Sequence, residues 1–119
     1  MRPRYSFTIC TRVVLGRPSE FDVEERAAFP FSPVEAIVNT VRPGLLFLTS
    51  LEFDGLRVLR GASLDLYLAS NVAPLEKIAT ISRPSGVRRV RMVGSYSGLT
   101  WDRGGDDREF AFVLALFGS

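Results

Sequence analysis

Two β-type runs separated by a short turn constrain this chain more than any other feature. The runs are Leu45–Phe53 and Leu56–Ser70, and apolar residues alternate with polar ones through both. The pair Asp54-Gly55 between them favours the tight turn of a β-hairpin, because that turn needs positive φ angles. We therefore predict a central hairpin to which the rest of the chain adds strands. Gly61–Ser63 is expected to bulge or split the second run.

Period-two alternation recurs along the chain and predicts further strands. It is clearest at Tyr5–Gly16, where one face is apolar and the other mostly polar, as in an antiparallel sheet. The segment Phe21–Phe29 alternates too, and its charges favour an edge strand over a short helix. Another strand is expected at Val87–Val93. The final run, Phe110–Phe117, is apolar on both faces, which predicts that both faces are covered.

Turn residues separate these runs at intervals of roughly 8–15 residues, a spacing typical of β-sandwiches. A chain of 119 residues is long enough for one core and too short for two. We predict a single, mainly β domain over residues 1–119. Its expected architecture is an antiparallel, jelly-roll-like β-sandwich of about seven strands.

The segment 33–42 predicts one short helix. Ser32 stands where an N-cap would be, Pro33 where the first helical residue would be, and Glu35 where a capping-box partner would be. Apolar residues then recur at helical spacing, at Val34, Ile37, Val38 and Val41. A strand is the alternative because Val and Ile favour strands. The helix is the preferred interpretation.

The absence of one residue type and the scarcity of another narrow the range of possible functions. The sequence has no His and a single Cys, Cys10, so it lacks the usual ligands of zinc, copper and haem. It also lacks the residues of Ser-His-Asp and Cys-His catalysis, and no phosphate-binding loop motif is present. We therefore expect a protein that is not an enzyme and carries no cofactor.

The sequence also bears on location. No apolar run approaches the roughly 18 residues of a membrane span, and the N-terminal segment lacks the apolar core of a secretory signal. A single cysteine gives no sign of an oxidising compartment. We expect an intracellular protein, or one within an assembled particle, without membrane contact.

Acidic residues gather around Gly104-Gly105, at Asp102, Asp106 and Asp107. Carboxylate oxygens are the ligands that a hard cation such as Ca²⁺ prefers. Basic residues are interleaved among them, however, and the spacing does not match an EF-hand. A solvated hairpin tip is therefore favoured over a metal site.

The densest basic segment lies on the strand predicted around residues 87–93. Its arginines and the aromatic residues that follow them are Arg88, Arg89, Arg91, Tyr96 and Trp101. On a strand, Arg89 and Arg91 share one face and Arg88 lies on the other. Basic and aromatic side chains together can bind single-stranded nucleic acid. Because the net charge is only +2, a solvated or subunit-contacting strand is favoured.

Five short motifs follow one another from Phe29 onward. They are Phe29-Pro30, Arg42-Pro43, Leu51-Glu52-Phe53-Asp54, Leu64-Asp65-Leu66-Tyr67-Leu68 and the run Phe110–Phe117. Their order resembles the C-terminal domain of plant-type polyphenol oxidases. The fourth motif departs from the family's Lys-Phe-Asp-Val, and the capping box at Ser32 stands where the family has a strand. The resemblance implies a jelly-roll-like sandwich that packs on a catalytic domain, and no copper site.

From these features we expect a non-catalytic structural or protein-interaction subunit of a larger assembly. Nine Phe residues and the doubly apolar last run indicate a surface that another protein chain covers, in a homo- or hetero-oligomer. A shielding domain, or a virion coat or decoration protein, fits this class. The alternative is a ligand- or nucleic-acid-binding module that uses the Arg88–Arg91 strand.

Overall fold

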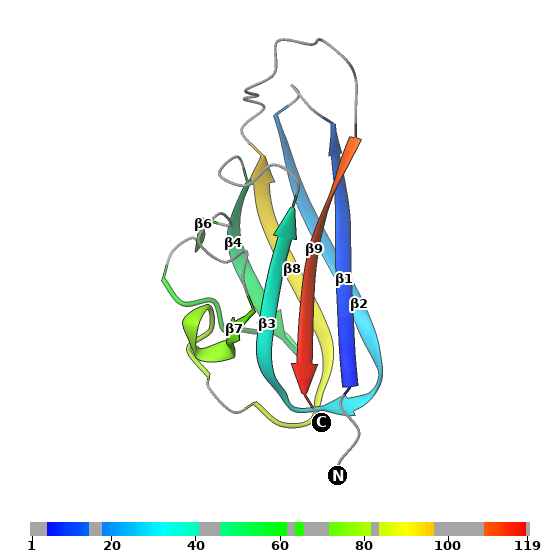
Figure 1. Ribbon diagram of the computed structural model, residues 1–119, viewed down its shortest axis with the longest axis vertical. Helices are drawn as coiled ribbons and strands as arrows, with labels where there is room; N and C mark the ends of the chain where they lie inside the picture. Colours follow the sequence, from blue (N-terminus) through cyan, green and yellow to red (C-terminus); the bar gives the residue numbers. More distant parts are fainter. Residues whose placement is uncertain are drawn as a thin grey trace.

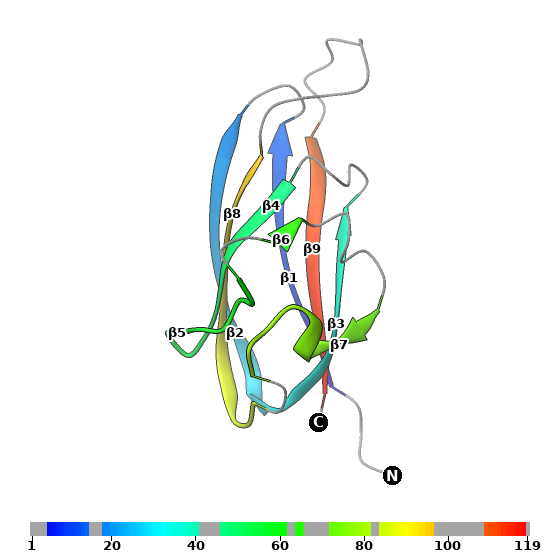
Figure 2. The same ribbon diagram turned by 90° about the vertical axis from the view of Figure 1, so that its left-hand side faces the viewer.

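The computed structural model consists of two antiparallel β-sheets packed face to face (Figures 1 and 2). It describes residues 5–14, 18–40, 46–61, 64–65, 72–81, 84–96 and 109–118. Within these residues the one helical element is a single 3₁₀ turn, η1 (Leu75–Lys77). The mainly β, antiparallel sandwich predicted from the sequence is confirmed.

The first sheet is built around the last strand, and we call it the β9 sheet. Its strand order is β1-β9-β3-β7. The bounds are β1 Tyr5–Val14, β3 Pro33–Thr40, β7 Ala73–Pro74 and β9 Glu109–Gly118. β9 therefore pairs on both sides, with β1 and with β3, while β1 forms a free edge.

The second sheet is built around β8, and we call it the β8 sheet. Its strand order is β2-β8-β4-β5, and the short β6 also pairs with β4. The bounds are β2 Ser19–Phe31, β4 Leu46–Phe53, β5 Leu56–Arg57, β6 Leu64–Asp65 and β8 Val87–Tyr96. The chain crosses between the two sheets at each step from β1 to β4, so neighbours in sequence lie in opposite layers.

One apolar cluster fills the space between the layers. The central strands supply its least exposed side chains: Leu114 and Leu116 of β9, and Val90 and Met92 of β8, are all 0% exposed. Burying one such side chain stabilises the fold by about 1.5–3 kcal/mol. The two central strands therefore hold the sheets together.

The two strands predicted near the N-terminus, at Tyr5–Gly16 and Phe21–Phe29, are confirmed as β1 and β2. Along β1, Phe7, Ile9 and Val13 are buried while Thr8, Cys10 and Arg12 are exposed, as the alternation predicts. β2 lies at the edge of its sheet, with its charged residues exposed. Charged side chains along an edge strand discourage pairing with another chain.

The predicted hairpin is present, but it is not central. Asp54 (φ 52°) and Gly55 (φ 86°) form the turn between β4 and β5, with the positive φ angles that Asp-Gly pairs accept. Among the described residues of the second arm, however, the strands that pair with β4 are two short pieces, β5 and β6. Arg57 of β5 donates hydrogen bonds to the backbone oxygens of Thr49 (3.1 Å) and Gly61 (2.9 Å). The continuous partner of β4 is β8, which lies far away in sequence.

The helix predicted at 33–42 is wrong. Residues 33–40 form β3, which pairs with β9 from Pro33↔Gly118 to Thr40↔Phe112. Ala36 and Val38 are buried while Ile37 between them is half-exposed, which is period-two burial. β-branched residues lose side-chain freedom in a helix, so the pairing offered by β9 prevails over the capping signature. Pro33 is tolerated because it is the first residue of its strand.

Gly94 tests how closely β8 is packed. It lies opposite Phe21 of β2, and a Cβ atom there would lie 2.4 Å from both Phe21 Cζ and the backbone oxygen of Phe47. We expect Gly94→Ala to lower the free energy of unfolding by about 1–3 kcal/mol through overpacking. Urea denaturation measures this, with Ser95→Ala on the outward face as the control. A loss for Gly94→Ala no larger than for the control would contradict the packing described.

Candidate functional site

The structure places the predicted basic strand on β8, at the centre of its sheet. Arg89 and Arg91 point outward from the sandwich while Val90 and Met92 point into the core, so the two arginines share a face as predicted. Tyr96, expected beside them as a stacking surface, is 2% exposed and belongs to the core. Trp101 lies outside the described residues.

Arg91 is held between the two neighbouring strands. Its Nε donates to Oδ1 of Asp22 on β2 (2.7 Å), and its Nη1 lies 3.0 Å from Oε2 of Glu52 on β4. The hydrogen bonds from Arg91 lower the pKa of Asp22, and the same bonds, with the nearby Glu52 charge, raise the pKa of Arg91. Two carboxylates of this chain therefore already bind the Arg91 guanidinium, which the sequence analysis considered as a group that could bind nucleic acid.

Arg89 and Arg88 have different surroundings. The Nη1 of Arg89 lies 3.9 Å from a carboxylate oxygen of Glu24, at the limit of an ion pair. The backbone N–H groups of Arg88 and Arg89 donate to the Asp54 carboxylate, at 3.1 Å and 2.9 Å to Oδ1, which ties the β4–β5 turn to β8. The side chain of Arg88 makes no hydrogen bond or ion pair within the described part of the chain.

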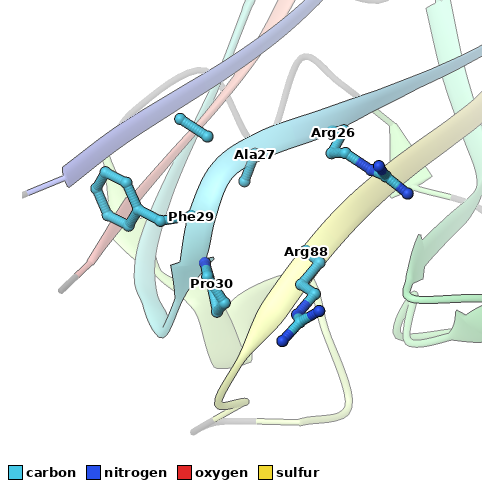
Figure 3. Close-up of a pocket in the computed structure, with 6 residues that line it drawn as sticks. Arg26, Ala27, Phe29, Pro30 and Arg88 are labelled. Carbon is cyan, nitrogen blue, oxygen red and sulfur yellow. The ribbon is translucent and has the colours of Figure 1, made fainter.

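A cavity of about 340 Å³ lies beside Arg88, where β2 bends (Figure 3). Its lining residues are Arg26, Ala27, Ala28, Phe29, Pro30 and Arg88. The sequence interpretation missed Arg26 because it treated the charges of this segment only as protection of an edge strand. Arg26 lies opposite Arg89 in the sheet, a position that depends on strand register and not on distance along the chain.

The outward surface of the β9 sheet has a different character, and we call it the β9 face. The described side chains that face outward on β1, β3 and β9 are Ser6, Thr8, Cys10, Arg12, Val14, Glu35, Ile37, Val113, Ala115 and Phe117. Only Arg12 and Glu35 among them are charged. A cavity of about 430 Å³ lies on this face, lined by Ser6, Glu35, Val72 and Phe117.

The prediction that β9 is covered on both sides is met on one side within this chain. Leu114 and Leu116 are fully buried against the β8 sheet, while Val113 and Phe117 on the β9 face stay partly exposed. An apolar strand at the centre of a sheet is expected to be covered on both faces. The β9 face therefore keeps apolar surface in contact with water.

The structure does not test the choice between a solvated hairpin tip, which the sequence favours, and a cation site. Asp102, Asp106 and Asp107 lie outside the described residues. Among the residues that are described, no group of three or more His, Cys, Asp or Glu side chains is arranged to hold a metal ion. No helix in the described ranges is long and apolar enough to cross a membrane.

Comparisons with protein-family models, with curated proteins and with solved structures give no match to this chain. The likeness to the C-terminal domain of polyphenol oxidases therefore stays a prediction.

The Asp22–Arg91 pair predicts a pH dependence of stability. Because folding lowers the pKa of Asp22, the pair stabilises the fold above the ordinary aspartate pKa of about 3.9 and ceases to do so as the pH falls through the folded-state value. We expect Asp22→Asn to be less stable than wild type at pH about 6 and equally stable at pH about 2.

Urea unfolding at both pH values measures this difference. The control is Glu20→Gln, a change on the same strand at a carboxylate without a partner among the described residues. A gap between wild type and Asp22→Asn that is as wide in acid as at neutral pH would contradict the role given to the pair.

Proposed function

We propose that this protein is a non-catalytic interaction subunit that associates with other protein chains through the β9 face. The observation that carries the proposal is the contrast between its two outward surfaces. One carries ion pairs between its strands, while the described outward residues of the other include two charged side chains, Arg12 and Glu35, and several apolar ones. The non-catalytic part of the proposal rests on a sequence without His and with a single Cys.

The outward surface of the β8 sheet is built to face water. Its charged side chains alternate in sign across the strands, from Asp22 and Glu24 on β2 to Arg89 and Arg91 on β8 and Glu52 on β4. Three of the resulting contacts lie within 4 Å. Exposed ion pairs add little stability, but they keep a sheet surface solvated and unattractive to apolar partners.

The β9 face lacks that protection. Its central row runs across three strands, from Thr8 on β1 to Ala115 on β9 and Ile37 on β3. None of the three is charged. Just beyond it Val72, which lines the cavity on this face, is 54% exposed. Apolar sheet surface of this kind favours a face-to-face contact with another sheet.

The occupant that we propose is a second copy of this chain. Strands of about nine residues, rising about 3.3 Å per residue and spaced about 4.8 Å apart, give the β9 face an area of about 400 Å². Two copies would bury at least about 800 Å², and the corrugation of side chains raises this toward the roughly 1,000 Å² of a specific interface. A nearly uncharged face also needs an uncharged partner, and a two-fold pair supplies one.

Size-exclusion chromatography with light scattering tests the proposal. We expect wild type to show a mass above that of the monomer that rises with concentration, and Ile37→Arg to weaken the association by at least about tenfold, because it buries an unpaired charge. Thr8→Arg, an exposed position in the same row, is a second variant that leaves the core untouched.

Val93→Arg is the matched control. Val93 faces outward at the centre of the β8 sheet and is also half-exposed, so it introduces the same charge on the other surface. It is expected to leave the association unchanged. A wild-type protein that stays monomeric at high concentration, or equal losses for Ile37→Arg and Val93→Arg, would contradict the proposal.

The nucleic-acid alternative is less well supported by the geometry. A single-stranded nucleic acid needs a row of free cations with aromatic side chains beside them. On β8, Arg91 is engaged by two carboxylates and Tyr96 is in the core. Arg26 and Arg88, whose side chains have no carboxylate partner among the described residues, both lie at one end of the sheet, at the bend of β2.

A further inference from the structure

The bend of β2 opens the cavity of about 340 Å³ because the strand leaves its sheet there. Arg26 is paired with Arg89 of β8, and the next pair is Phe31 with Val87. Residues 27–30 therefore lie opposite Arg88 alone. This interruption of the β-ladder leaves a hollow between the two strands, which the cavity occupies.

Contacts with β1 keep the bend away from β8. The backbone N–H of Ala28 donates to the hydroxyl of Tyr5 (3.3 Å), and the ring of Phe29 packs on that of Tyr5 with centroids 4.3 Å apart. Figure 3 shows the Phe29 ring on one side of the bend, and Arg26, Pro30 and Arg88 on the other. The hollow is thus fixed by aromatic packing and does not depend on a ligand to form.

Positive charge is concentrated at this hollow. The guanidinium groups of Arg26 and Arg88 have no hydrogen bond or ion pair among the described residues. Arg89, opposite Arg26, has only Glu24 at 3.9 Å. No carboxylate is among the residues that line the cavity. Like charges at directly opposed positions destabilise a sheet, and Glu24 offsets the repulsion between Arg26 and Arg89 only from 3.9 Å, so an anion bound by Arg26 would reduce it further.

We propose that this cavity binds a terminal phosphoryl group, a tetrahedral oxyanion with two negative charges, between Arg26 and Arg88. Guanidinium groups donate paired N–H bonds that match the oxygens of such a group. A dianion also matches the charge of the two unpaired arginines. A phosphodiester chain fits less well, because the next outward arginine on β8, Arg91, is already bound to Asp22 and Glu52.

Titration of the ¹⁵N-labelled protein with inorganic phosphate, followed by NMR at constant ionic strength and pH about 8, tests the proposal, because phosphate is then mostly dianionic. We expect saturable shifts of the Ala27 and Ala28 amide signals with a dissociation constant in the millimolar range. Arg26→Gln and Arg88→Gln are each expected to weaken binding by at least about tenfold.

Two controls make the result specific. Lys77→Gln removes the same charge from an exposed residue that does not line the cavity, and it is expected to leave binding unchanged. Dimethyl phosphate, a diester with one charge, is expected to bind at least about fivefold more weakly than inorganic phosphate. The amide signals of β9 report whether each variant is folded.

Several outcomes would overturn the proposal. These are shifts that do not saturate, an equal loss of binding in Lys77→Gln, and equal binding of dimethyl phosphate. Unchanged phosphate binding in folded Arg26→Gln and Arg88→Gln would also exclude the cavity as the site. The site lies at the end of the β8 sheet, so its test is independent of the association proposed for the β9 face.

Discussion

The apolar packing of β8 against β9 is the constraint on which the rest of the structure depends. Each is the central strand of its sheet, and their inward side chains meet in one cluster. The pairing register with β8 and β9 then fixes the positions of the flanking strands. It also fixes which side chains of those strands face outward. The ion pairs across the β8 sheet and the composition of the β9 face both depend on the position of these two strands. Burial of apolar surface thus decides the arrangement, and polar contacts adjust it.

Local patterns predicted what depends on neighbours in sequence. Alternation identified β1, β2 and β8, the continuous apolar run identified β9, and Asp54-Gly55 indicated the turn of the hairpin. The predictions were wrong where pairing between strands that are far apart in sequence determines the structure. Residues 33–40 have a helix-start signature and β-branched side chains, and pairing with β9 selects the strand. The local pattern around Asp54-Gly55 predicts a central hairpin, but it contains no sign that β4 pairs with β8, which is far away in sequence.

Register also explains what the sequence could and could not indicate about sites. The sequence shows the arginines of β8 as a dense basic segment, but it does not show which carboxylates bind them. Asp22 and Glu52 reach Arg91 only because β2 and β4 flank β8 in one alignment. The same alignment brings Arg26 beside Arg89, and the bend of β2 brings it to the cavity that Arg88 also lines. A one-residue shift would turn each of these side chains to the other face.

In the proposed association a second copy covers the β9 face, while the outward surface of the β8 sheet stays in water. Cys10, the only cysteine, is exposed at the edge of the β9 face and is a natural probe of it. The most direct measurement is the rate at which a thiol reagent labels Cys10 at increasing concentrations of native protein. The account predicts that the rate falls as concentration rises, and that Ile37→Arg abolishes this protection. A labelling rate that is independent of concentration would contradict it.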